Sequence, residues 1–284
     1  MIRAAGHTMA TPDATLEEAL VLLAEIGFEG VEIICADDYP CGLPTRPTTA
    51  QLTSVRSAAE QLGLAVANVV PYVRPINARD ERTRLGHVDE MRRCLDIAAA
   101  IGSLSVRVWA GVDPEPGHET EQQELLVDSL RRLAGHAADL DVRLNVENHM
   151  GSHAISGAIT TEIVQEVGSP YVGILYDPAN LLVLGDADYQ EAFTLQAPYI
   201  GHVHFKDVDV LGGGKHMPRL VGEGEVPWAW ILPALAASGY SGFVSTEFEK
   251  RWHPQELPPS REGLQHELAQ LRWMLSAPDD RVGA

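Results

Sequence analysis

Short apolar, β-branched runs alternate with longer segments of helical period along the whole chain. The runs predict eight strands, over Ile2–Met9, Gly30–Ala36, Ala65–Tyr72, Leu104–Trp109, Val142–His149, Val172–Asp177, Ile200–Val208 and Gly242–Phe248. The segments between and after them predict eight helices, over Thr15–Gly27, Thr48–Leu62, Asp80–Ile101, Glu119–Leu140, Thr160–Val167, Ala187–Gln196, Trp228–Ala237 and Arg261–Leu275. Glycines at several helix ends, such as Gly27 and Gly63, are typical of C-caps.

Eight consecutive strand–helix pairs predict a single (β/α)8 TIM barrel, because parallel strands need helical crossovers. We expect this domain to span residues 1–277 and residues 278–284 to form a flexible tail. The competing architecture is a doubly wound open sheet. No G-x-G-x-x-G motif follows the first strand, so the sequence predicts no nucleotide cofactor.

The charge balance narrows the choice of partners. The 284 residues include 40 Asp and Glu against 21 Lys and Arg, a formal net charge of −19. Such a surface repels phosphate backbones and anionic lipid, which argues against nucleic-acid and membrane partners. There is no signal-peptide pattern, no apolar run long enough to span a bilayer, and only three cysteines. We therefore expect a reduced, cytoplasmic, soluble protein.

Candidate chemistry lies where four consecutive predicted strands end. Glu147, Asp177, His204 and Glu247 each stand near the carboxyl end of a strand, the face of such barrels that carries active sites. Any one of them alone would suit a helix cap, a turn or a core histidine. Together they would gather three carboxylates, and Lys and Arg are scarce in these segments. A divalent cation, Mn²⁺, Mg²⁺, Co²⁺ or Zn²⁺, is the expected compensation.

Five motifs carry a family resemblance: E-N-H at 147–149, Y-D-P-A-N at 176–180, H-V-H-F-K-D at 202–207, G-E-G-E-V-P-W at 222–228 and T-E-F-E at 246–249. In this order they resemble the xylose-isomerase-like superfamily and, within it, the sugar phosphate isomerase/epimerase group. The resemblance implies one divalent cation held by the four strand-end residues. It also implies that Glu147 and Glu247 form an acid–base pair that exchanges the proton α to a carbonyl, while the metal stabilises the enediolate.

By this resemblance the leading hypothesis is an isomerase or epimerase of a small sugar, keto sugar or polyol. Candidate substrate-binding residues are His7, Trp109, His149, His153, Asn180 and Lys206. Lys206 lies two positions after His204, so alternation turns both to one side of the strand. His153 stands where ketose epimerases carry a second substrate-touching carboxylate, which weakens a simple ketose 3-epimerase assignment.

Two further enzyme classes share some or all of these motifs. Inosose and dehydroshikimate dehydratases begin with the same proton abstraction, so a lyase is the alternative. Endonuclease IV, which resembles this chain in the barrel and not in all of these motifs, is a remote alternative, because its additional zinc ligands are replaced here, for example by Asn180 and Pro218.

The glycine-rich segment 211–220 has two readings, a mobile lid and a tolerated surface insertion. Trp228, Trp230 and Trp252 are compatible with a homodimer or homotetramer interface and equally with internal packing.

Overall fold

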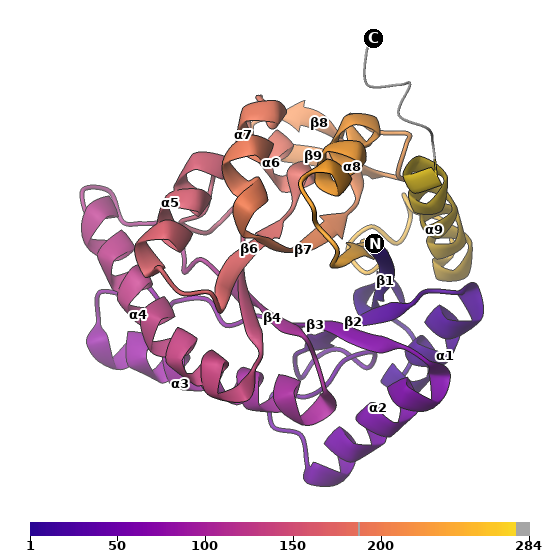
Figure 1. The fold of residues 1–284 in the computed structure, drawn as a ribbon, viewed down its shortest axis with the longest axis horizontal. Helices are drawn as coiled ribbons and strands as arrows, with labels where there is room; N and C mark the ends of the chain where they lie inside the picture. Colours follow the sequence, from indigo (N-terminus) through magenta and orange to yellow (C-terminus); the bar gives the residue numbers. More distant parts are fainter. Residues whose placement is uncertain (187, 277–284) are drawn as a thin grey trace.

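Eight parallel strands close into a barrel with helices around it (Figure 1). The computed structural model describes residues 1–186 and 188–276. The barrel strands are β1 (Arg3–His7), β2 (Gly30–Cys35), β3 (Ala65–Pro71), β4 (Ser105–Trp109), β5 (Arg143–Glu147), β6 (Val172–Tyr176), β7 (Ile200–Phe205) and β10 (Phe243–Thr246). β10 pairs with both β7 and β1, which closes the ring and confirms the predicted (β/α)8 barrel.

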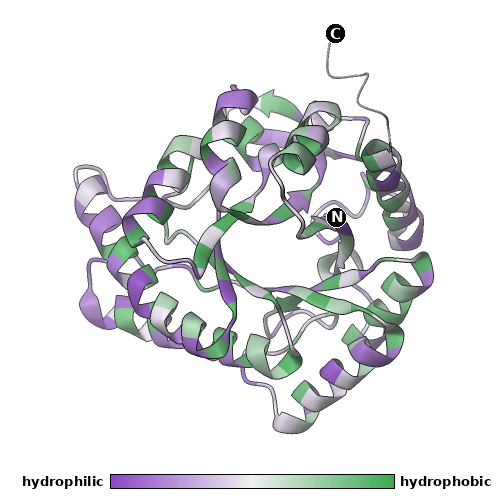
Figure 2. Cartoon of the chain, viewed as in Figure 1, coloured by the Kyte–Doolittle hydropathy of each residue, from purple (hydrophilic) through white to green (hydrophobic). Residues whose placement is uncertain are grey.

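The helices follow the strands and cover the outside of the barrel. They are α1 (Leu16–Ile26), α2 (Thr49–Leu62), α3 (Glu81–Ile101), α4 (Glu119–Leu140), α5 (Gly157–Val167), α6 (Pro178–Leu184), α7 (Tyr189–Gln196), α8 (Trp228–Ala237) and α9 (Ser260–Ser276). In α1, Leu16, Leu20 and Leu23 are buried against the strands, and polar positions face outward (Figure 2). The helix ends at Gly27, whose φ of 102° is the predicted left-handed C-cap.

Two elements differ from the expectation. The short helix α6 begins directly after Asp177, which caps it while Pro178 fills its first position; the sequence pattern predicted no helix between Asp177 and Ala187. The segment expected as a flexible insert belongs to an antiparallel hairpin of β8 (Asp207–Gly212) and β9 (Lys215–Arg219). Its three glycines, residues 212–214, all have positive φ and form the tip.

The remaining expectations have mixed outcomes. Trp228 is buried and Trp230 packs against Phe193, so internal packing accounts for both, whereas Trp252 is 54% exposed. The predicted tail lies outside the described residues. No helix in the described ranges is long and apolar enough to cross a membrane.

Candidate active site

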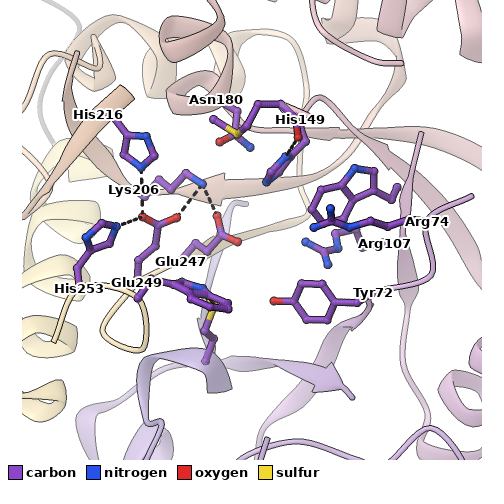
Figure 3. Close-up of a pocket in the computed structure, with 14 residues that line it drawn as sticks. Tyr72, Arg74, Arg107, His149, Asn180, Lys206, His216, Glu247, Glu249 and His253 are labelled. Atoms are coloured by element: carbon purple, nitrogen blue, oxygen red, sulfur yellow. Dashed lines mark hydrogen bonds and ion pairs between the residues drawn. The ribbon is translucent and has the colours of Figure 1, made fainter. Parts of the chain in front are cut away.

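A pocket of about 260 Å³ opens where the barrel strands end at their carboxyl side. Its lining comes from loops after most of the strands: Met9, Tyr72, Arg74, Arg107, Trp109, His149, Met150, Asn180, Lys206, His216, Glu247, Glu249, Trp252 and His253. Figure 3 shows Tyr72, Arg74 and Arg107 on one side, and Lys206 with its acidic and imidazole neighbours on the other.

Below the pocket, four buried side chains converge. We call Glu147, Asp177, His204 and Glu247 the inner cluster; they can each offer one ligand atom, and these four atoms lie within 4.8 Å of one another. Glu147 ends β5, Asp177 follows β6, His204 lies in β7 and Glu247 follows β10. The parallel register brings these strand ends to one face, which is why residues a hundred positions apart meet.

Glu32 on β2 fixes the orientation of His204. Its Oε1 lies 3.0 Å from His204 Nε2 and also accepts a hydrogen bond from Asn68 Nδ2 at 2.7 Å. His202 turns to the same side of β7 and lies 3.5 Å from the other Glu32 oxygen. With Nε2–H donated to Glu32, the second nitrogen, Nδ1, faces the carboxylates of the inner cluster.

The donor set of the inner cluster fits a divalent cation. His204 Nδ1 lies 3.2 Å from Glu147 Oε1 and 3.2 Å from Glu247 Oε2. Among the described residues, neither His204 Nδ1 nor Glu147 Oε1 has a hydrogen-bond partner, although both are buried. Burial lowers the pKa of His204, but Glu247 and Glu32 outweigh it and raise this pKa well above its usual value. The cluster therefore stabilises positive charge at this point, and one imidazole with three carboxylates suits Mn²⁺, Mg²⁺, Co²⁺ or Zn²⁺.

Two permanent cations also pair with these carboxylates, although Lys and Arg are scarce in the strand-end segments, as noted from the sequence. Arg107 Nη1 donates to Glu147 Oε2 at 3.0 Å. Lys206 Nζ lies 2.7 Å from Glu247 Oε2, 2.9 Å from Asp177 Oδ2 and 3.3 Å from Glu249 Oε1. Two cations still face five buried or nearly buried carboxylates, those of Glu32, Glu147, Asp177, Glu247 and Glu249, so the surplus negative charge remains.

The two glutamates proposed as an acid–base pair have different surroundings. Glu247 lines the pocket, whereas Glu147 is fully buried and held by Arg107. Burial raises the pKa of Glu147, but Arg107 and His204 more than offset it and lower the pKa to about 2. Burial raises the pKa of Glu247 too, but His204 and Lys206 outweigh it and hold this pKa well below its usual value. Both glutamates are therefore suited to staying ionised, which favours ligands over groups that exchange protons.

His149 presents a second candidate base to the pocket. Its ring packs against Trp109 with centroids 4.2 Å apart, and its Nδ1 is hydrogen-bonded to the Met150 carbonyl. A donated Nδ1–H leaves the Nε2 lone pair available. Burial lowers the pKa of His149, and neighbouring Glu147 only partly reverses this, so the neutral imidazole is favoured.

Asn148 and Asn180 tie the loops after β5 and β6 together. Asn148 Nδ2 donates to the Asp177 carbonyl at 2.6 Å, and Asp177 N donates back to Asn148 Oδ1 at 3.1 Å. Asn180 N donates to Asp177 Oδ1 at 2.9 Å, while Asn180 Nδ2 donates to the Asn148 carbonyl at 3.2 Å. These bonds hold the Asp177 carboxylate in place, and Asn180 also lines the pocket.

Two of the six candidate substrate contacts lie away from the pocket. His7 is buried beside His204, with 6.1 Å between ring centroids, and its Nδ1 accepts from Met9 N at 3.0 Å. Burial lowers the pKa of His7 to about 4, despite Glu32 and Glu247. His153 Nε2 instead contacts Gln123 at 3.2 Å, because its backbone N–H is bonded to Ala110 and turns the side chain toward α4. The other four, Trp109, His149, Asn180 and Lys206, do line the pocket.

Asp207 organises the G-E-G turn beside the site. Its carboxylate accepts four backbone N–H bonds, from Val208 and Val226 on Oδ1 and from Gly222 and Gly224 on Oδ2, at 2.9–3.1 Å. A Cβ on Gly224 would lie 2.3 Å from Asp207 Oδ1, so only glycine allows this approach. The turn leads into Trp228, whose Nε1 donates to the Lys206 carbonyl at 2.9 Å. The Asp207 carboxylate is thus bonded to the turn, whereas the ammonium group of the neighbouring Lys206 is paired with carboxylates of the inner cluster.

Several pocket residues were missed from the sequence. Arg107 could have been found, because alternation along β4 places it on the same side as Trp109. Glu32 is fully buried below the pocket, and the predicted site residues did not include it. His216, Glu249 and His253 come from the hairpin and from the long segment after β10, and no spacing rule links them.

Most of the chain, residues 20–274, matches the family model of the xylose isomerase-like TIM barrel. The chain belongs to this family, as the resemblance of its motifs predicted.

Relatives include both lyases and an isomerase. A 3-dehydroshikimate dehydratase of Pseudomonas putida is 28% identical over 240 residues, which are 82% of this chain and only 36% of that protein. An inosose dehydratase of Lacticaseibacillus casei is 26% identical over 257 residues, 84% of this chain and 83% of that one. A D-psicose 3-epimerase of Agrobacterium fabrum is 23% identical over 237 residues, covering 79% and 76% of the two chains. The homologues are thus enzymes of the sugar epimerase/isomerase and dehydratase kind.

A solved structure agrees in fold. The crystal structure of the IolI protein with a bound zinc atom superposes with a TM-score of 0.80 over 97% of this chain and 98% of that one, at 19% identity. This likeness concerns the barrel. The inner cluster itself is the candidate site for a divalent cation.

Proposed function

We propose that this protein is a metal-dependent dehydratase that removes water from a small polyhydroxylated ketone, with a carboxylate-bearing ring as the preferred substrate. The observation that carries the proposal is the pairing of a neutral imidazole, His149, with an ammonium group, Lys206, in the lining of one pocket. The sequence alone favoured an isomerase or epimerase. The burial of Glu147 behind Arg107 shifts the preference to a lyase, which needs only one base.

The elimination uses one proton-transferring group and one hydrogen-bond donor. His149 Nε2 accepts the proton α to the carbonyl, the carbon–oxygen bond of the β-hydroxyl breaks, and a double bond forms between the two carbons. The His149 imidazolium returns its proton to the departing hydroxyl, which leaves as water. Burial lowers the pKa of Lys206, but Asp177 and Glu247 outweigh it and hold this pKa well above its usual value, so Lys206 stays an ammonium and donates a hydrogen bond to the departing oxygen. When held by the inner cluster, a divalent cation would polarise the substrate carbonyl. Trp109 packs against His149 and limits the directions in which the imidazole can turn.

An acidic substrate is supported by the opposite wall of the pocket. The Arg74 guanidinium lies 3.9 Å from the centre of the Trp109 ring, and none of the ion pairs among the described residues includes it. A permanent cation on a pocket wall is suited to a substrate carboxylate. This favours a molecule such as 3-dehydroshikimate over the uncharged inosose.

An epimerase is the second candidate, because Glu147 Oε1 and Glu247 Oε2 approach His204 Nδ1 from two sides at equal distance. The two reactions separate in heavy water. The protein, supplied with Mn²⁺, Mg²⁺ or Co²⁺, is incubated with 3-dehydroshikimate, inosose and ketoses. A dehydratase produces a conjugated product with new near-ultraviolet absorbance. Deuterium uptake into a substrate of unchanged composition would instead establish epimerisation and overturn the proposal.

The base is tested by a matched pair of histidine variants. His149→Gln is expected to lower kcat by about 10²–10⁴-fold. His153→Gln, four residues along the same loop but outside the pocket, is expected to change kcat less than about twofold. Equal losses in both variants would remove His149 from the role of base.

A further inference from the structure

A second group of potential ligands lies at the mouth of the pocket. His216 on β9, Glu249 after β10 and His253 further along form what we call the outer cluster. Their ligand atoms lie within 4.8 Å of one another, and their side chains are 25%, 15% and 25% exposed. Figure 3 shows both imidazole rings turned toward the Glu249 carboxylate.

The spacing in the outer cluster leaves room for an ion. The Nε2 atoms of His216 and His253 each lie 3.9 Å from the same oxygen, Glu249 Oε2. This distance exceeds that of a hydrogen bond. Ligand atoms about 2.0–2.2 Å from a shared metal lie roughly 3.0–3.5 Å apart, so closure needs a movement of about half an ångström. The rings belong to side chains on β9 and on the segment after β10, and rotation about their side-chain bonds allows that movement.

We propose that the outer cluster binds a second divalent transition-metal ion, with zinc as the best-suited metal and water or substrate at the open positions. Two imidazoles and one carboxylate favour zinc, nickel or copper over magnesium or calcium. The inner cluster has the opposite balance, three carboxylates and one imidazole. The two clusters therefore differ in metal preference as well as in position.

Lys206 links the two clusters. Its Nζ lies 2.7 Å from Glu247 in the inner cluster and 3.3 Å from Glu249 in the outer one. An ion on Glu249 Oε2 would leave Oε1 to this ammonium and would place a second positive charge on the same carboxylate. It would also join β9 to the segment after β10 and fasten the hairpin over the pocket.

The number of ions per chain tests the proposal. Metal-free full-length protein is titrated with Zn²⁺ by calorimetry and checked by elemental analysis. We expect two ions per wild-type chain and the loss of one in the His216→Ala/His253→Ala variant, with at least tenfold weaker binding at that site. His87→Ala, which removes an exposed histidine of α3, is the matched control and should keep both ions. Equal stoichiometry and affinity in the wild type and the double variant would overturn the outer site.

A complementary variant separates this proposal from the proposed function. Asp177→Asn should weaken the inner site and leave the outer one, which Co²⁺ reports through absorption bands of imidazole ligation in the visible range. If Asp177→Asn retains one zinc ion, and adding His216→Ala/His253→Ala to it removes this ion as well, the outer site is established whatever reaction the enzyme catalyses. If Asp177→Asn alone abolishes all binding, the outer cluster holds no metal.

Discussion

The four hydrogen bonds on Asp207 make Asp207→Asn the most informative single substitution for the architecture of the site. An amide retains one acceptor oxygen and presents an NH₂ group in place of the other. If the oxygen stays on Val208 and Val226, the amide nitrogen faces the N–H groups of Gly222 and Gly224. Two hydrogen bonds to a charged acceptor are lost, and two donors are left without a partner.

The expected cost follows from these contacts. A hydrogen bond to a charged group contributes about 1.5–3 kcal/mol, so two of them set a range of about 3–6 kcal/mol. Gly222 and Gly224 are only partly buried, and water can reach their N–H groups, so we expect a value of about 3 kcal/mol. This is a large fraction of the 5–15 kcal/mol that is usual for the free energy of unfolding of a domain.

Urea unfolding followed by far-ultraviolet circular dichroism measures this loss. Asp209→Asn on the same hairpin is the control, because Asp209 pairs only with Arg219 at the surface and should cost less than about 1 kcal/mol. Turnover should fall in Asp207→Asn as well, since the turn carries Trp228, which is bonded to the Lys206 carbonyl. If Asp207→Asn unfolds within about 1 kcal/mol of the wild type at unchanged m-value, the turn does not depend on this carboxylate.

Three other predictions follow from the buried charges. Glu247→Gln should lower turnover at least 100-fold with unchanged circular dichroism. Glu147→Gln should also lose activity, and in addition about 3–5 kcal/mol of stability, because the buried Arg107 loses its paired carboxylate. Full activity in both variants would refute the inner cluster. Chelation should abolish activity and Mn²⁺, Co²⁺ or Mg²⁺ should restore it, whereas indifference to chelator in protein shown to be metal-free would exclude a metal-dependent reaction. Burial, with Glu249 and Asp207 nearby, raises the pKa of Glu267 well above its usual value. The pKa of a glutamate in the unfolded chain is about 4.3, so the contribution of protonated Glu267 to stability is fully present below about this pH. This contribution is lost as pH rises through the pKa of Glu267 in the folded protein. The melting temperature of Glu267→Gln should exceed that of the wild type by a difference that grows between pH 5 and pH 8. A difference that stays constant over this range would contradict the prediction.

The barrel was predictable because its signals are local. Apolar runs and glycine C-caps such as Gly27 mark each strand and helix end independently of the rest of the chain. The convergence of Glu147, Asp177, His204 and Glu247 was predictable for the related reason that parallel strands end on one face. The short helix α6 was missed, although Asp177 followed by Pro178 is a recognisable helix start.

The outer cluster could not be predicted in the same way. His216 reaches the pocket only because β8 and β9 pair as a hairpin, and the glycine-rich tip gave no sign of this register. Arg107 was overlooked for a different reason. A single arginine between two valines is typical of a half-buried strand, and only the closed barrel shows that it meets Glu147.

The inner cluster depends on residues from both halves of the barrel, because Glu32 and Arg107 lie in the first half and contact it. All four residues of the inner cluster belong to the part of the chain from β5 onward, whereas Glu32 lies on β2 and Arg107 on β4. A fragment beginning at β5 would carry every proposed ligand but would lack the carboxylate that orients His204 and the guanidinium that pairs with Glu147. A separately produced fragment that begins at β5 should therefore form a working inner cluster only after it is combined with the fragment that contains β1 to β4.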